Sequence, residues 1–125
     1  MHSPLARLDV LSVCLPDPPD WNGGASWRRA GSAREAIQAM RGRQVELLLS
    51  SMRIPDMPLW PLIDRIRTLR PRQPWMLIER QLSAGDEVRA RALGVLQVCE
   101  QMPPQAALLP ILEALRRARP RSESG

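Results

Sequence analysis

The chain has 125 residues, which is the size of one domain with enough length to bury a core. Its 18 basic residues, all of them arginine, exceed its 13 acidic residues, and four tryptophans are its only aromatic residues. With so few aromatic side chains we do not expect a platform on which nucleic-acid bases stack, and the scattered arginines are typical of a solvated surface.

The remaining composition excludes several classes of protein. The N-terminal region does not resemble a signal peptide, because the apolar run 8–15 is short and Asp9 interrupts it. No stretch is long enough to span a membrane. Two cysteines, Cys14 and Cys99, and one histidine, His2, are too few for a disulfide scaffold or a zinc site. We therefore expect a cytoplasmic protein without a metal or a cofactor.

The first part of the chain predicts two strands joined by an irregular segment. Leu8–Cys14 is rich in apolar and β-branched residues, which indicates a buried strand. Leu15–Ser26 contains three prolines and two adjacent glycines, so it cannot hold a helix of useful length. Trp27–Ala30 is a weaker candidate for a second strand. Any helix that connects these two strands is therefore shortened or missing.

The later part alternates between helical and strand patterns. Ser32 and Glu35 form a capping box, and the apolar run from Val45 to Leu49 is typical of a strand covered on both faces. Pro71 and Gly94 mark the ends of two helices. The expected elements are, in order, helix 33–41, strand 45–49, helix 59–70, strand 75–78, helix 83–93, strand 95–99 and helix 106–119.

This alternation favours an α/β fold with a parallel sheet and helices on both faces. Five strands predict a doubly wound, flavodoxin-like sheet of order 2-1-3-4-5. We expect residues 1–119 to form a single domain and residues 120–125 to be a disordered tail.

The stretch Val45–Met57, VELLLSSMRIPDM, is the feature around which the chain is organised. It is a buried strand that ends abruptly at two serines, and the carboxyl ends of parallel strands form the working edge of an open α/β sheet. The segment Ser51–Met57 resembles the part of response-regulator receiver domains that follows the phosphorylated aspartate, with Ser51 in place of that aspartate. The resemblance extends from Arg7 to Arg117.

The resemblance implies a phosphoacceptor pocket that has lost its chemistry. Phosphoryl transfer to aspartate requires the nucleophile, an acidic pair that holds Mg²⁺, a hydroxyl and a lysine. The nucleophile position is occupied by Ser51, the acidic pair by Cys14 and Leu15, the hydroxyl by Glu79 and the lysine by Gln101. We therefore expect a degenerate pocket in which aspartyl phosphorylation does not occur.

Two catalytic alternatives carry less weight. Asp17 and Asp20 lie in the proline-rich segment without a carboxylate partner at the end of the first strand. Ser50 and Ser51 lack the G-x-S-x-G elbow of an esterase, and the only histidine is His2. We expect a chain that is not an enzyme and a Ser51 that only caps the end of its strand.

The function that follows is an aspartate-less pseudo-receiver, a signalling or regulatory module that acts by protein–protein interaction. It is similar to the receiver-like domain of the amidase-operon antiterminator regulators. The alternative is a small nucleic-acid-associated regulator that uses the arginines of the last helix and the tail. Because the arginines of 65–72 and 116–121 belong to helices on opposite sheet faces, we do not expect sequence-specific nucleic-acid binding by this chain alone.

The missing first helix predicts an interaction surface. One sheet face would be covered by the last helix alone, so apolar surface beside that helix should attract a second copy or another protein. No membrane partner is expected. The residues we expect to contact the partner are Trp21, Trp27, Leu108, Leu112 and Leu115.

Overall fold

The computed structural model describes residues 9–16 and 26–118. Five strands form one parallel sheet, and four helices cover it. The strands are β1 (Asp9–Val13), β2 (Ser26–Ala30), β3 (Leu47–Ser50), β4 (Trp75–Ile78) and β5 (Gln97–Cys99). The helices are α1 (Ala33–Gly42), α2 (Leu59–Leu69), α3 (Ala84–Ala92) and α4 (Gln105–Ala118).

The strand order β2-β1-β3-β4-β5 confirms the predicted flavodoxin-like topology. Val10 in β1 pairs with Trp27 in β2 on one side and with Leu47 in β3 on the other, and every neighbouring pair of strands is parallel. All the carboxyl ends of the strands therefore lie at one edge of the sheet, which we call the carboxyl edge.

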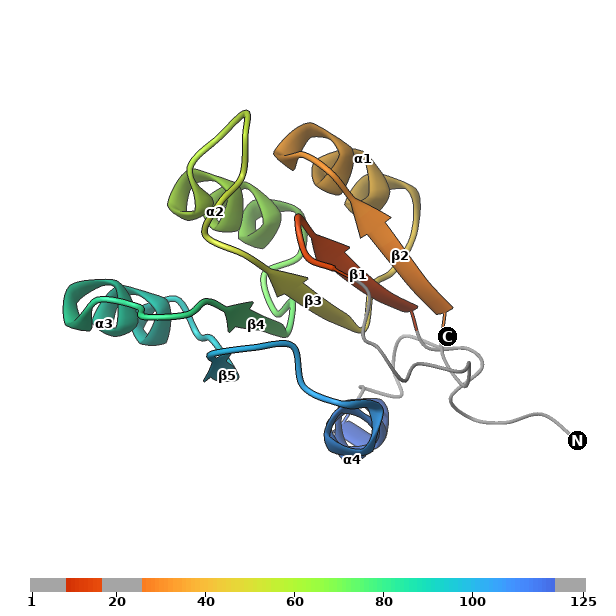
Figure 1. The fold of residues 1–125 in the computed structure, drawn as a ribbon. Coiled ribbons are helices and arrows are strands. Elements are labelled where there is room, and N and C mark those ends of the chain that lie inside the picture. The colour runs from red at the N-terminus through yellow and green to blue at the C-terminus, as the bar shows by residue number, and fades with distance from the viewer. Residues whose placement is uncertain (1–8, 17–25, 119–125) are drawn as a thin grey trace, which may run out of the picture.

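The helices form two layers of unequal size. Figure 1 shows α1, α2 and α3 on one face of the sheet and α4 on the other. Leu11 and Val13 of β1 belong to the core cluster beneath α1 and α2, whereas Val10 belongs to the cluster beneath α4. Successive side chains of β1 thus pack against opposite helix layers, as expected for a strand buried on both faces.

Local signals in the sequence explain most helix boundaries. Ser32 accepts a hydrogen bond from the Glu35 N–H at 3.1 Å, and Ser83 accepts one from the Asp86 N–H at 3.1 Å. Gly94 has a φ of +80° directly after α3, a conformation that glycine adopts without strain. The cap at Ser32 confirms the predicted start of α1 at Ala33, and α3 begins at Ala84, one residue after its predicted start.

Most elements differ from their predicted ranges by one or two residues, and β3 begins at Leu47, not Val45. The first strand ends at Val13 because Cys14 adopts a left-handed backbone with a φ of 57°. The last strand is three residues long and begins at Gln97, not Val95. Pro110 lies inside α4. Among the helices of the described ranges, none is long and apolar enough to cross a membrane.

Candidate functional site

Ser51 lies at the carboxyl edge, directly after β3, and is 8% exposed. Its N–H donates to the Val13 carbonyl at 3.2 Å, which ties it to the end of β1. Its Oγ accepts a hydrogen bond from the Arg53 N–H at 2.9 Å. The hydroxyl therefore stabilises the turn that leaves the strand, as expected for a serine that caps a strand end.

Glu79 follows β4 and reaches towards the same turn. Its N–H donates to the Cys99 carbonyl at 2.8 Å, and its Oε1 accepts a hydrogen bond from the Met52 N–H at 3.2 Å. This contact joins two segments that are 27 residues apart in the sequence. A negative charge thus lies next to Ser51, where it opposes the approach of an anionic phosphoryl donor.

Cys14 occupies the end of β1, where its N–H donates to the Ala30 carbonyl at 2.8 Å. Burial raises the pKa of the Cys14 thiol above its ordinary value of 9.0, and the negative charges of Asp56 and Glu35 raise this pKa further. The side chain is therefore a neutral thiol near pH 7. A neutral thiol is a poor ligand for a hard cation.

The structure brings together only part of the predicted pocket. The Ser51 N–H donates to the carbonyl of Val13, the residue before Cys14, and the Met52 N–H donates to the Glu79 carboxylate, so these three positions are neighbours at the carboxyl edge. Leu15 instead packs against the core cluster beneath α4, and Gln101 is exposed after β5. The five residues named from the sequence therefore do not line one shared cavity.

A Mg²⁺ ion of the kind that the receiver resemblance implies does not fit these residues. Mg²⁺ prefers several carboxylate, carbonyl and water oxygens in octahedral geometry. At the end of β1 the chain offers a thiol from Cys14 and an aliphatic side chain from Leu15. Within residues 9–16 and 26–118, no group of three His, Cys, Asp or Glu side chains could hold a metal ion. Asp17 and Asp20 lie outside these residues.

Asp56 has a role at this edge that the sequence analysis missed. Its two carboxylate oxygens accept hydrogen bonds from the Ala33 N–H at 2.8 Å and the Arg34 N–H at 3.1 Å, at the N-terminus of α1. The bond from Ala33 is the largest of the causes that lower the pKa of Asp56 below its ordinary value of 3.8. The loop after β3 therefore caps a helix that precedes it by more than 20 residues.

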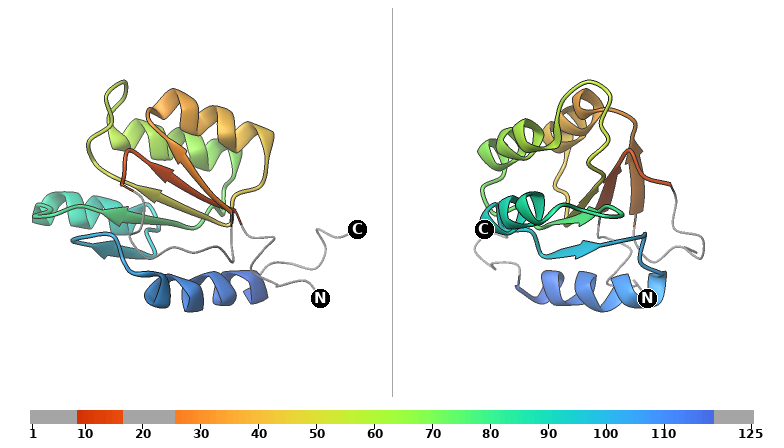
Figure 2. Two further views of the ribbon diagram at one scale, coloured as in Figure 1. Left: turned by 45° about the vertical axis from the view of Figure 1, so that its right-hand side comes forward. Right: turned by 60° about the vertical axis from the view of Figure 1, so that its left-hand side comes forward.

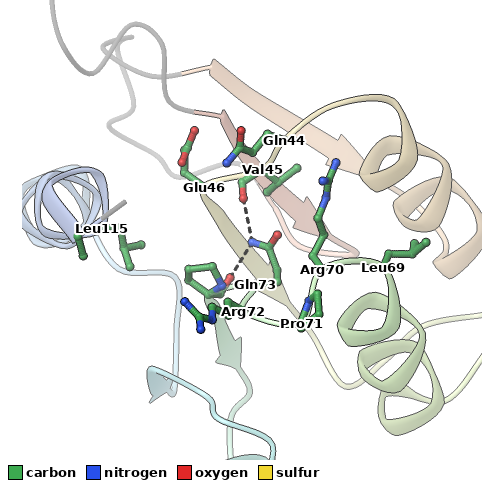
Figure 3. A pocket seen from close by; sticks show the side chains of 11 residues that line it. Gln44, Val45, Glu46, Leu69, Arg70, Pro71, Arg72, Gln73 and Leu115 are labelled. Atoms are coloured by element: carbon green, nitrogen blue, oxygen red, sulfur yellow. Dashed lines mark hydrogen bonds between the residues drawn. The ribbon is translucent and has the colours of Figure 1, made fainter. Parts of the chain in front are cut away.

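Two hollows on the described surface could admit a ligand. The larger of the two, of about 550 Å³, lies at the amino ends of β3 and β4 (Figure 3), whereas Ser51 follows the carboxyl end of β3. Its centre is occupied by Gln73, whose side-chain amide donates to the Val45 and Pro74 carbonyls at 3.0 Å each. The smaller, of about 340 Å³, lies between α1, α2 and the loop after β3. Neither hollow is lined by Ser51 or Glu79, so neither is a phosphoacceptor pocket.

The residues expected to contact a partner differ in their exposure. Leu108 and Leu112 are fully buried against Val10, Leu47, Leu49 and Met76. They therefore belong to the core and have no surface to offer to a partner, which corrects the expectation for these two leucines. Trp27 and Leu115 are half-buried beside the same cluster, and Trp21 lies outside the described residues.

Comparison with known proteins supports the fold. No protein-family model and no curated protein sequence matches the chain. Solved structures do match. The CheY-like response regulator receiver domain protein from Methanospirillum hungatei JF-1 has a TM-score of 0.69 at 19% identity, over 94% of this chain and 98% of that one. The chain has the receiver fold.

Two further structures agree with this assignment. The non-phosphorylated HemR receiver domain from Leptospira biflexa has a TM-score of 0.69 at 19% identity and covers 92% of this chain and 99% of that one. A two-component response regulator from Clostridium difficile has a TM-score of 0.71 at 16% identity and covers 90% of this chain and 98% of that one. All three similarities are similarities of fold, and each extends over at least 90% of this chain and 98% of the other chain.

Proposed function

We propose that this receiver-fold chain is a non-catalytic signalling module that acts in the cytoplasm by binding another protein, independently of aspartyl phosphorylation. The observation that carries the proposal is the contact between Glu79 and the Met52 N–H at 3.2 Å. Through this contact the Glu79 carboxylate lies beside Ser51. Ser51 is the residue for which the receiver resemblance implies a phosphorylated aspartate.

The neighbouring residues support the same conclusion. A serine becomes nucleophilic only when a base takes the proton of its hydroxyl. The Ser51 Oγ accepts a hydrogen bond from the Arg53 N–H, and the nearby Glu79 Oε1 is engaged by the Met52 N–H. Cys14 provides a neutral thiol where the resemblance implies a metal ligand. A receiver fold that lacks the residues for phosphoryl transfer can still present its surface to a partner protein.

The positions of the arginines argue against the nucleic-acid alternative. Arg65 and Arg67 are exposed on α2, and Arg116 and Arg117 are exposed on α4. Because α2 and α4 cover opposite faces of the sheet, these two pairs do not form one continuous footprint (Figure 1). Protein binding remains the function that the surface supports best.

Beryllofluoride with Mg²⁺, a mimic of the aspartyl phosphate, tests the proposal. A ligand that binds the native state raises its unfolding temperature. We expect the unfolding temperature of the wild-type chain to be the same with and without the mimic. A saturable increase would contradict the proposal.

A further inference from the structure

The hollow between α1 and α2 has a basic rim. It is lined by Arg34 and Arg41 of α1 and by Arg65 of α2, all three exposed. We call this hollow the arginine groove. Figure 2 shows α1 and α2 lying side by side on the same face of the sheet, so the arginines stand on both sides of the groove.

The guanidinium groups of Arg41 and Arg65 are available to a ligand, whereas Arg34 already has an electrostatic attraction to Asp56. Within the described residues, Arg34, Arg41 and Arg65 make no ion pair. Asp56 is the single acidic residue in the lining, and its two oxygens already accept hydrogen bonds from the first turn of α1. Three positive charges against one negative charge leave the groove with an excess of positive charge.

Two apolar side chains also line the groove. Ile37 is 7% exposed and Met57 is half-buried, and both belong to the lining together with the polar side chain of Gln38. The exposed part of Met57 can contact an apolar side chain of a ligand that also carries negative charges. The combination of separate charges and an apolar strip is typical of a surface that binds a polypeptide.

The distance between the arginines of the groove favours an acidic polypeptide over nucleic acid as the ligand. Arg34 and Arg41 are seven residues apart on one helix, which places them about 10 Å apart along its axis. Nucleic acid presents a phosphate charge every 1.7 Å or so along a duplex, and such a dense polyanion would also meet Asp56. Two carboxylates that lie two turns apart on a helix, or three residues apart on an extended chain, match the spacing better.

We infer that the arginine groove is the docking surface for an acidic segment of a partner protein, with two carboxylates paired to Arg34 and Arg41, an apolar side chain over Ile37 and Met57, and Arg65 closing the opposite side. This inference rests on the proposed function, because it names the class of partner that the module binds. Arginine suits this role because its guanidinium group can donate two parallel hydrogen bonds to one carboxylate.

The test maps binding on the whole chain by two-dimensional ¹H–¹⁵N NMR. The probe is a synthetic helical peptide that carries two glutamates seven positions apart and a leucine between them. We expect concentration-dependent shifts confined to the amides of α1, α2 and the loop after β3. Shifts that are spread over both layers of the fold, or no shifts at all, would overturn the inference.

Matched variants separate the groove from general attraction to a basic protein. Arg41→Gln with Arg65→Gln removes two charges from the groove, and Arg116→Gln with Arg117→Gln removes two charges from α4. All four side chains are exposed, so neither change should disturb folding. The groove variant should bind the peptide about five- to tenfold more weakly than wild type, while the α4 variant should bind it as wild type does. Equal weakening in both variants would overturn the inference.

Two further titrations complete the test. One distinguishes an acidic protein segment from nucleic acid, and the other tests the proposed function separately from the groove. A short single-stranded oligodeoxynucleotide should produce no shifts in the groove at concentrations where the peptide saturates it. Stronger binding of the oligonucleotide there would replace the acidic protein segment with nucleic acid. Shifts of Ser51 and Met52 on addition of beryllofluoride and Mg²⁺ would contradict the proposed function alone, because these residues do not line the groove.

Discussion

The carboxylate of Glu79 accepts a hydrogen bond from the backbone N–H of Met52, at 3.2 Å, directly beside Ser51. A side chain from the end of β4 thereby holds the turn that leaves β3. The contact gives the carboxyl edge an internal negative charge, and replacement of Glu79 should therefore disturb this edge.

Replacement of Glu79 by alanine should release the Met52 N–H and loosen the turn after Ser51. We expect the free energy of unfolding to fall by about 1 kcal/mol, the worth of a typical hydrogen bond. Urea denaturation measures the loss, and hydrogen exchange should show faster exchange of the Met52 amide. Glu79→Gln keeps an acceptor oxygen and is the control. If Glu79→Ala left the exchange of Met52 unchanged, the contact would have no role in holding the turn.

Asp56 predicts a dependence of stability on pH. Its pKa is lower in the folded chain than the ordinary 3.8, so its stabilising effect is fully present above pH 3.8 and is lost as the pH falls through the folded pKa. The stability lost on Asp56→Asn should therefore be largest near neutral pH and should shrink below about pH 4. Urea midpoints of both proteins across this range measure the difference.

The control for that experiment is the uncharged cap of the same helix. Ser32→Ala removes the acceptor for the Glu35 N–H and should lower the free energy of unfolding by about 1 kcal/mol at every pH. A loss on Asp56→Asn that stayed constant over the same range would show that the carboxylate charge does not stabilise α1.

Leu112 and Leu115 should behave differently because only Leu112 is fully buried. Leu112→Ala leaves a cavity beneath α4 and should lower the free energy of unfolding by about 2–5 kcal/mol. Leu115→Ala should cost roughly 1 kcal/mol, because its side chain is already partly in water. Chemical denaturation of both variants tests this order, and a reversed order would contradict the packing of α4 described above.

Leu115 also tests the association expected from the sequence. Leu115→Arg places a charge at the rim of the α4 face without removing a fully buried side chain. If this face holds a second copy, light scattering should report a larger mass for the wild type than for Leu115→Arg. A wild type that is monomeric at all concentrations would exclude self-association through this face.

The two cysteines should remain reduced thiols. Cys14 follows β1 and Cys99 ends β5, and the strand order places these strands three spacings apart, or about 14 Å. A disulfide needs Cα atoms within about 7 Å of each other. Burial is the main cause that raises the pKa of both thiols above 9.0, so alkylation near pH 8 should be slower in the folded chain than in urea. An intramolecular disulfide in the native protein would contradict the strand order.

Local patterns in the sequence predicted the strands, the helices and their order. The apolar run from Val45 to Leu49 indicated a strand buried on both faces, and these residues are buried in the structure. The contacts of the carboxyl edge could not be predicted in this way. Asp56 bonds to Ala33 across 23 residues, and the contact from Glu79 to Met52 spans 27. Neither contact has a periodicity or a motif that marks it.

The separation of the predicted pocket residues has an equally local cause. The left-handed backbone at Cys14 ends β1, and Leu15 then packs against the core beneath α4. Positive φ is uncommon for residues other than glycine, so the sequence Val13-Cys14-Leu15 gave no sign of it. The role of Leu108 and Leu112 could not be predicted for a similar reason. An apolar stripe on a helix predicts that one face is buried, but it does not predict whether the sheet or a partner protein buries that face.

The most direct test of the account is the mass of the intact protein after incubation with acetyl phosphate and Mg²⁺. We predict that the wild type gains no phosphoryl group. Ser51→Asp alone should gain none either, because Cys14, Glu79 and Gln101 still leave the nucleophile without its cations. A canonical receiver domain incubated in parallel is the positive control. The contradicting result is a wild type whose mass increases by one phosphoryl group and loses that increase on treatment with hydroxylamine, which cleaves acyl phosphates. Such a result would show that this chain does not act independently of phosphorylation.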